Sequence, residues 1–307
     1  MSQLPMVSIC CTTYNHEKYI KQCLEGFLMQ QTNFKVEILI FDDASNDKAQ
    51  TIIKKIAAAN DTIKLFLQNE NQWSKNRYGL MDWLFPAAKG KYIALCEGDD
   101  YWIDPLKLQK QVDFMEANPD YSGIGTNAEV RYEYSVREKH LFKNYPTTTF
   151  DINNFLESRP FHTATFMFRK AAYKNDFPTA ILSADRALYM LMSCFGKIYY
   201  LEDVTAVYRR NEKGLSRNVT SKLMKKDYAI AKYIQKYNAN FEYYRLQAFV
   251  AYTIFAYSHN IYLKDFLKNS VLLVYYRLKR EDNTSIKSVL YSSYKLISKS
   301  YKKVQSI

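Results

Sequence analysis

The first hundred residues alternate between short apolar runs and segments in which apolar side chains recur at helical spacing. The apolar runs predict buried strands over residues 6–12, 36–41, 63–67 and 91–96. The helical spacing predicts helices over residues 20–28, 47–59 and 76–88. Strands that alternate with helices in this way predict a parallel sheet flanked by helices, which is an α/β fold.

The pattern becomes less regular after residue 100 and changes again near residue 220. Helices are expected from residue 105 to about 116 and over 183–195. Between residues 121 and 168 periodicity is weak, with strand-like pieces such as 163–168; two more short strands are expected at 197–201 and 204–208. From about residue 220 the pattern is helical to the end, in three or four segments. We therefore expect an α/β domain over residues 1–219 and a helical region over 220–307.

The charge of the chain changes at the same place. The formal net charge is +12, but residues 1–219 hold 27 Lys and Arg against 26 Asp and Glu, whereas residues 220–307 hold 16 against 5. The last region also contains 13 tyrosines. Basic and aromatic residues together suit an anionic membrane interface, so we expect peripheral contact with the inner face of the cell membrane. Formation of a homo-oligomer through the same helices, or a solvated basic surface without a partner, are the alternatives.

Other features indicate a cytoplasmic protein. No apolar run approaches the length of about 18 residues that a spanning helix needs, and the first residues lack the basic and apolar regions of a secretory signal. Five cysteines without CxxC spacing fit free thiols in a reducing compartment. They are Cys10, Cys11, Cys23, Cys96 and Cys194.

Polar residues follow three of the predicted strands, where a parallel sheet binds its ligands. The first strand is followed by Thr12 and Tyr14, the second by Asp42 and Asp43, and the fourth by Glu97, Asp99 and Asp100. Converging carboxylates repel one another unless a cation lies between them, and oxygen ligands suit Mg²⁺ or Mn²⁺. The Glu97-x-Asp99 spacing places two carboxylates on one side of an extended segment. Such a metal would neutralise a departing diphosphate.

Structural roles are the alternative for these carboxylates. Asp99 or Asp100 could cap the helix that follows, and Asp42 with Asp43 could form an Asx turn before the next helix. The chain contains neither GxGxxG nor GxxxxGK[ST], so dinucleotide-binding and P-loop proteins lose their main support.

Several ordered segments together resemble the family 2 glycosyltransferases. They are residues 7–20 (VSICCTTYNHEKYI), 37–47 (EILIFDDASND) and 90–102 (GKYIALCEGDDYW). The last segment resembles the metal-binding motif in the EGDDYW form found among capsule, O-antigen and other bacterial surface-polysaccharide transferases. The resemblance covers roughly residues 5–218.

This resemblance implies a GT-A fold with a Rossmann-like, mostly parallel sheet and, here, a C-terminal α-helical extension. It implies a nucleotide-sugar site within about residues 1–104 and an acceptor side over about 105–219. The implied reaction is inverting transfer from a nucleotide-sugar to a glycan or lipid-linked glycan acceptor. UDP-sugars are favoured, because a carboxylate such as Asp43 can accept the imide N–H of uracil.

The resemblance also assigns residues to the donor and the metal. Thr12, Tyr14 and Asp43 would hold the base and ribose, with Asp42 as the neighbouring option. Glu97 and Asp99 would be the metal-binding pair for Mn²⁺ or Mg²⁺, with Asp99 nearest the metal. Arg77 is a further donor-site candidate, and the alternative for it is an exposed surface position.

Three later segments complete the predicted site. Residues 162–169 (HTATFMFR) are similar to the acceptor-side lining and include His162, for which core packing is the alternative. Residues 183–185 (SAD) fall where the family places its general base, so Asp185 is the expected base and a helix N-cap is the alternative. Residues 207–216 (VYRRNEKGLS) resemble the family's closing stretch, in which Arg209 or Arg210 would reach phosphate. Asn211 stands where the family often has His.

Three other classes of protein are less consistent with these residues. A nucleic-acid binder would explain the sequence pI of about 9.2, but the basic region contains no recognisable module. A non-catalytic nucleotide-sugar-binding protein would not need Glu97, Asp99 and Asp185. A sugar nucleotidyltransferase normally carries a glycine-rich signature near its N-terminus, which this chain lacks.

Overall fold

The computed structural model describes residues 4–179, 181–211, 219–257, 263–280, 292–295 and 297. The chain divides into two compact units. The first unit comprises Met1–Asp151, Arg159–Thr179 and Leu191–Glu212, and the second comprises Ile152–Ser158, Ala180–Met190 and Lys213–Ile307. The expected domain boundary near residue 220, and the donor and acceptor halves of the first domain, stay predictions.

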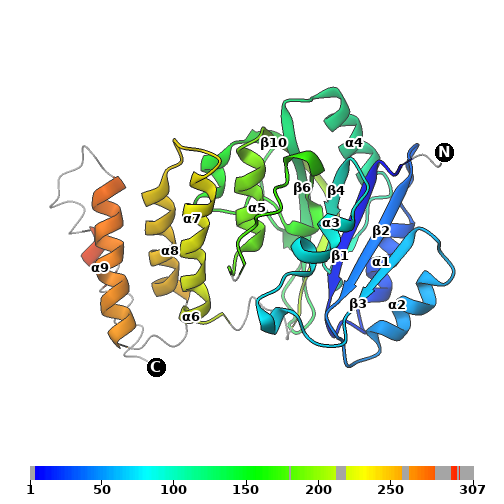
Figure 1. The fold of residues 1–307 in the computed structure, drawn as a ribbon, viewed down its shortest axis with the longest axis horizontal. Helices are drawn as coiled ribbons and strands as arrows, with labels where there is room; N and C mark the ends of the chain where they lie inside the picture. Colours follow the sequence, from blue (N-terminus) through cyan, green and yellow to red (C-terminus); the bar gives the residue numbers. More distant parts are fainter. Residues whose placement is uncertain are drawn as a thin grey trace. The chain divides into compact units, whose positions relative to one another are not determined.

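The first unit is built on one mixed sheet of ten strands among the described residues, and it confirms the expected α/β fold (Figure 1). The strand order is β3-β2-β1-β4-β9-β6-β10-β5. The strands β1 (Val7–Thr13), β2 (Val36–Asp42), β3 (Ile63–Leu67) and β4 (Tyr92–Leu95) are parallel, as predicted. Their carboxyl ends therefore meet along one edge of the sheet.

The second half of the sheet mixes directions. The strand β9 (Met167–Arg169) runs antiparallel between β4 and β6 (Tyr121–Tyr132). The long strand β10 (Lys197–Arg210) is parallel to β6, and β5 (Tyr101–Trp102) is antiparallel to β10. Two short strands pair outside this order: β7 (His140–Leu141) with β6, and β8 (Thr148–Phe150) with β10.

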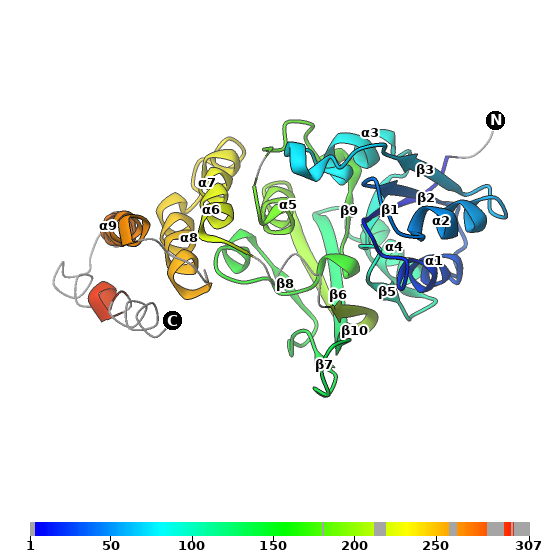
Figure 2. The same cartoon turned by 90° about the horizontal axis from the view of Figure 1, so that it is seen from below.

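Helices cover both faces of the sheet. Figure 2 shows α1 (Ile20–Leu28) and α2 (Ala49–Ala57) on one side of strands β1 to β3 and α3 (Phe85–Ala87) on the other. The strands β1, β2 and β4 are almost wholly buried, which is why the sequence of each is a near-continuous apolar run. The helix α4 (Lys107–Ala117) packs on β6.

Four predicted elements differ from the structure. The segment 76–88 contains a π-helix of six residues, Gly79–Leu84, and residues 163–168 begin with a 3-10 helix over Thr163–Thr165 rather than a strand. The strands expected at 197–201 and 204–208 are one strand, because a register shift between Leu201 and Val204 keeps the polar pair between them within β10. The strand β6 was not predicted.

Glycines explain why β6 is hidden in the sequence. A Cβ atom at Gly125 would lie 2.6 Å from the Phe161 ring, and one at Gly123 would lie 2.8 Å from the Phe166 ring. These two positions must therefore be glycine so that the aromatic rings can pack on the strand. Glycine disfavours strands by propensity alone, so the local pattern points away from the true structure.

The second unit is helical, as expected of the C-terminal extension. Its described helices include α6 (Ser221–Met224), α7 (Tyr228–Gln235), α8 (Tyr243–Tyr257) and α9 (Leu263–Arg280), with the 3-10 turn Lys225–Asp227 between α6 and α7. Ala248, Ala251 and Leu273 form a small core between α8 and α9. Among the described residues, no helix combines the length and apolar character needed to span a bilayer.

Candidate functional site

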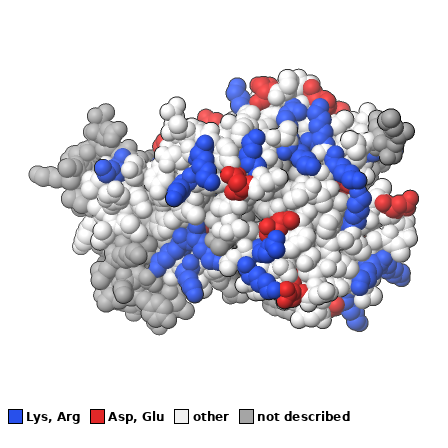
Figure 3. All heavy atoms as spheres, viewed as in Figure 1, with Lys and Arg blue, Asp and Glu red and all other residues white. Residues whose placement is uncertain are grey.

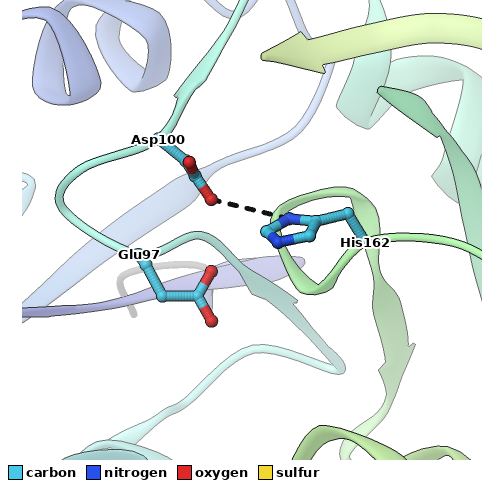
Figure 4. Close-up of side chains that lie close together, drawn as sticks. All are labelled: Glu97, Asp100 and His162. Carbon is cyan, nitrogen blue, oxygen red and sulfur yellow. Dashed lines mark ion pairs between the residues drawn. The ribbon is translucent and has the colours of Figure 1, made fainter. Parts of the chain in front are cut away.

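Three potential metal ligands meet just beyond the carboxyl end of β4. Glu97, Asp100 and His162 each place one ligand atom within 4.8 Å of the others (Figure 4). The Nδ1 atom of His162 lies 3.5 Å from Oδ2 of Asp100. Asp100 is buried, whereas Glu97 and His162 are half-buried, so the cluster is reachable from solvent.

His162 is held in place by local structure. It precedes the 3-10 helix Thr163–Thr165, and its Nδ1 accepts the backbone N–H of Ala164 at 3.3 Å. Its ring stacks on Tyr208 of β10 with centroids 4.0 Å apart. The structure brings His162 to residues 97–100 (EGDD), which we call the acidic loop. Its predicted acceptor-side role stays a prediction.

Asp100 is fixed from strand β10. Its Oδ1 accepts the backbone N–H of Arg209 at 2.8 Å. Burial, reinforced by the nearby Asp99 and Glu97 carboxylates, raises the pKa of Asp100 well above its ordinary value, and Arg209 opposes this rise. The helix-cap alternative for Asp100 is wrong, because α4 begins at Lys107 and it is the Gln30 side chain that accepts an N–H in its first turn, that of Leu108.

Asp99 faces a different set of residues. Its Oδ2 accepts the Nδ2–H of Asn211 at 2.8 Å and lies 3.9 Å from Nε2 of His16. The other ring nitrogen of His16 contacts Thr13 Oγ1 at 3.1 Å. The predicted metal pair of Glu97 and Asp99 stays a prediction, and the geometry adds a second set made of Glu97, Asp100 and His162.

The donor atoms of this second set fit a divalent cation. Two carboxylates and one imidazole suit a first-row metal such as Mn²⁺, and the carboxylates alone suit Mg²⁺. Negative charge is also concentrated there, because Glu97, Asp99 and Asp100 lie within four consecutive residues. A cation between these carboxylates would relieve the repulsion that raises the pKa of Asp100.

The side chain of Arg209 binds the acidic loop. Its Nη1 donates to the backbone oxygen of Asp99 at 2.7 Å, and its Nη2 donates to Gln22. The guanidinium lies 4.2 Å from the ring centroid of Tyr101 and 5.1 Å from that of Tyr19. Arg209 is buried, so in this structure it positions the loop, and its predicted phosphate contact stays a prediction.

The Asp42–Asp43 pair shapes the turn after β2. Asp42 accepts hydrogen bonds from the backbone N–H and the hydroxyl of Ser45, which is the Asx turn given above as the alternative. Asp43 accepts the backbone N–H groups of Gln72 and Trp73. A carboxylate retains further acceptor positions, so donor binding by Asp42 or Asp43 stays a prediction.

The remaining predicted donor residues lie on or near the surface. Thr12 is half-buried at the end of β1 and Tyr14 is exposed just beyond it. Arg77 is also exposed; its Nε lies 3.5 Å from Asp82 and its guanidinium lies over the Trp83 ring. Contact of these three residues with a nucleotide stays a prediction.

Asp185 belongs to the second unit and lies in the first turn of α5 (Ala184–Ser193). Its Oδ1 accepts the backbone N–H of Arg186 at 2.7 Å. Asp227 secures the start of this helix, because its carboxylate accepts the N–H groups of Leu182 and Ser183 and the Ser183 hydroxyl. The role of Asp185 as general base stays a prediction.

The sequence analysis gave no role to His16, and it placed Asp100 among the converging carboxylates but outside the predicted metal pair, with a helix cap as the alternative. His16 had one local signal, the spacing of three residues that brings it to Thr13. Asn211 was noted only as a departure from the family pattern. Its contact with Asp99 spans 112 residues, and no local pattern reports a contact of that separation.

Comparison with protein families and curated proteins gives a consistent result. The model of the family described as Glycosyl transferase family 2 matches residues 8–177. The chain is 33% identical over 209 residues to the Mycobacterium tuberculosis protein Rv1520, covering 68% of this chain and 60% of that protein. It is 34% identical over 113 residues to Escherichia coli WfaP, named a UDP-Glc:alpha-D-GlcNAc-diphosphoundecaprenol beta-1,3-glucosyltransferase, covering 37% and 42% of the two chains.

Solved structures confirm the expected GT-A fold with its helical extension. S. aureus TarS 1-349 in complex with UDP-GlcNAc aligns with a TM-score of 0.67 at 18% identity, covering 97% of this chain and 91% of that one. The mannosyltransferase PcManGT from Pyrobaculum calidifontis, in complex with GDP-Man and Mn²⁺, aligns with a TM-score of 0.52 at 15% identity, covering 95% and 87%.

Proposed function

The chain belongs to glycosyl transferase family 2, and from this membership we propose that it transfers a sugar from a nucleotide-sugar to a glycan or lipid-linked glycan acceptor. The product would be part of a bacterial surface polysaccharide such as a capsule or O-antigen. The observation that carries the proposal is the convergence of Glu97, Asp100 and His162 beyond the strand end where such sheets bind ligands.

Similar proteins support a uridine donor and a lipid-linked acceptor. TarS is solved with UDP-GlcNAc, and the name of WfaP gives UDP-Glc as donor and a diphosphoundecaprenol-linked sugar as acceptor. A guanosine donor remains the second candidate, because PcManGT is solved with GDP-Man. Competition between UDP and GDP for the purified protein distinguishes the two, and we expect UDP to compete better.

The chemistry we propose is a single displacement with inversion. The acceptor hydroxyl oxygen bonds to the anomeric carbon while the bond from that carbon to the diphosphate oxygen breaks, and the hydroxyl proton passes to the Asp185 carboxylate. Glu97, Asp100 and His162, with Asp99 beside them, would hold Mn²⁺ or Mg²⁺. When bound, such a cation supplies positive charge beside the leaving diphosphate.

The location we propose is the cytoplasm, with peripheral attachment to the inner face of the membrane through the basic C-terminal helices. Lipid-linked acceptors lie at that surface. Self-association through the same helices is compatible with this attachment. No nucleic-acid partner is proposed.

The test is the release of UDP from a panel of UDP-sugars by the full chain, measured with Mn²⁺ and with excess EDTA. We expect metal-dependent release, lost in Asp100→Asn if the second ligand set operates and in Asp99→Asn if the first does. Asp185→Asn should lower turnover about 10²–10⁴-fold with little change in UDP affinity. UDP binding without turnover on any sugar would favour a non-catalytic binding protein, and full activity in EDTA would exclude the metal role.

A further inference from the structure

Helix α9 presents an apolar stripe to solvent. Val271, Tyr275 and Leu278 are 69%, 47% and 37% exposed, and their spacing of four and three residues places them on one face of the helix. The opposite face is the packed one, because Leu273 is 1% exposed in the small core with Ala248 and Ala251. Leaving three large apolar side chains in water side by side costs free energy that a partner would recover.

The sequence of α9 is rich in basic residues. The helix sequence LKDFLKNSVLLVYYRLKR contains five basic residues and one acidic residue. Exposed lysines also occur elsewhere in the described C-terminal helices, and Figure 3 shows Lys and Arg side chains over the helices of the second unit with few Asp or Glu among them. These lysines are Lys222, Lys232, Lys295 and, directly after α7, Lys236; Lys279 of α9 is exposed as well.

We infer that the α9 stripe docks on the surface of an anionic lipid membrane, with α9 lying in the plane of the interface. A helix with an apolar face and basic flanks inserts that face at the boundary between headgroups and acyl chains, while lysines contact lipid phosphates. Tyrosine suits this depth because it joins an apolar ring to a polar hydroxyl. The inference refines the membrane contact of the proposed function by naming the face that makes it.

Charge argues against a second copy as the occupant. A symmetric dimer through α9 would place the same basic surface opposite itself, and residues 220–307 carry a net charge of +11. Like charges at close range oppose association. An anionic bilayer is complementary to both the apolar stripe and the net positive charge of residues 220–307.

The test is sedimentation of the full chain with phosphatidylcholine vesicles that contain or lack phosphatidylglycerol, at low and high salt. We expect binding to the anionic vesicles at low salt and weaker binding at high salt. Val271→Ser combined with Leu278→Ser should lower the partition coefficient about ten-fold. The matched control is Val136→Ser combined with Leu141→Ser, which changes an exposed Val and Leu of the first unit and should leave binding unchanged.

Three results would overturn the inference. The first is no binding to anionic vesicles at low salt, and the second is equal loss in both double variants. The third is a concentration-dependent dimer in sedimentation velocity that the Val271/Leu278 variant abolishes, because it would make a second copy the occupant. UDP release from a UDP-sugar in the absence of vesicles is measured in parallel, so failure of the membrane contact is distinguished from failure of the proposed transferase.

Discussion

A lysine is completely buried in the first unit. Lys107 has no exposed surface; its Nζ donates to Gln111 Oε1 at 2.7 Å and lies 4.3 Å from the Trp102 ring centroid. Gln111 in turn donates to the backbone oxygen of Thr165, next to the segment that carries His162. Burial lowers the pKa of Lys107 to about 7, and the nearby Cys96 and Asp104 partly oppose this.

This lysine should make stability depend on pH. The unfolded chain keeps the proton up to the ordinary pKa of 10.5, whereas the folded chain releases it above about 7. Between these values the unfolded state binds more protons, so the free energy of unfolding should rise with pH. Lys107→Met should remove this rise and add about 1–4 kcal/mol below pH 7, measured by denaturant unfolding across that range.

Lys110 on the same helix is the matched control for this measurement. It is exposed and pairs with Asp104 and Asp203, which raise its pKa. Lys110→Met should therefore change the free energy of unfolding by less than about 1 kcal/mol and leave the rise between pH 7 and 10 intact. An identical pH dependence in the wild type and Lys107→Met would show that Lys107 is not the source.

At the scale of elements, the end of β10 organises the acidic loop. The backbone and guanidinium of Arg209 bind Asp100 and Asp99, and Asn211 binds the Asp99 carboxylate. Arg209 of β10 and Asn211 just beyond it thus fix both carboxylates that follow Gly98 without providing a metal ligand themselves. Groups that orient metal ligands in this way often affect metal affinity and activity strongly when they are mutated.

Arg209→Met should therefore raise the Mn²⁺ concentration for half-maximal UDP release and lower turnover, each about 10–100-fold. Arg209→Lys keeps the charge but loses the planar, forked arrangement of N–H donors. Its Mn²⁺ requirement and its turnover should therefore lie between those of Arg209→Met and those of the wild type. Metal titrations of UDP release measure both effects. A loss confined to UDP affinity, with an unchanged Mn²⁺ requirement, would instead support the phosphate contact predicted from the sequence.

The elements that could be predicted are those whose own residues specify them. The strands β1 to β4 and helices α1, α2 and α5 each contain a complete apolar pattern, and all were predicted to within a few residues. The strand β6 was not predicted, because Gly123 and Gly125 are required by aromatic rings that lie more than thirty residues further along the chain. The sequence left Asp100 with two possible roles for the same reason, since its partner Arg209 lies 109 residues further along the chain.

At the scale of the whole molecule, the basic C-terminal region does more than carry charge. Asp227, which follows residue 219, accepts three hydrogen bonds from Leu182 and Ser183 at the start of α5. Arg186 of α5 also lies 4.6 Å from the Phe249 ring centroid of α8. A chain ending at residue 219 would lose these contacts, and with them the support of the turn that contains Asp185.

Asp227→Ala tests this dependence without truncation. It should lower the free energy of unfolding by about 1–3 kcal/mol, because three donors lose their acceptor. Turnover should fall if Asp185 is the base, whereas UDP affinity should stay near the wild-type value. Glu242→Ala, at an exposed position paired with Arg245, should change stability by less than about 0.5 kcal/mol. Unaltered turnover in a folded Asp227→Ala protein would show that the contacts of Asp227 at the start of α5 are not needed for catalysis.

The contacts of Arg209 and Asn211 also set when the site can first exist during synthesis. The acidic loop leaves the ribosome 112 residues before Asn211, the residue that binds Asp99. At about 5–20 residues per second, that interval lasts roughly 6–20 seconds. During it, the Asp99 and Asp100 carboxylates lack the residues that hold them. A nascent chain therefore gains its full complement of loop contacts only after about two thirds of it has been translated.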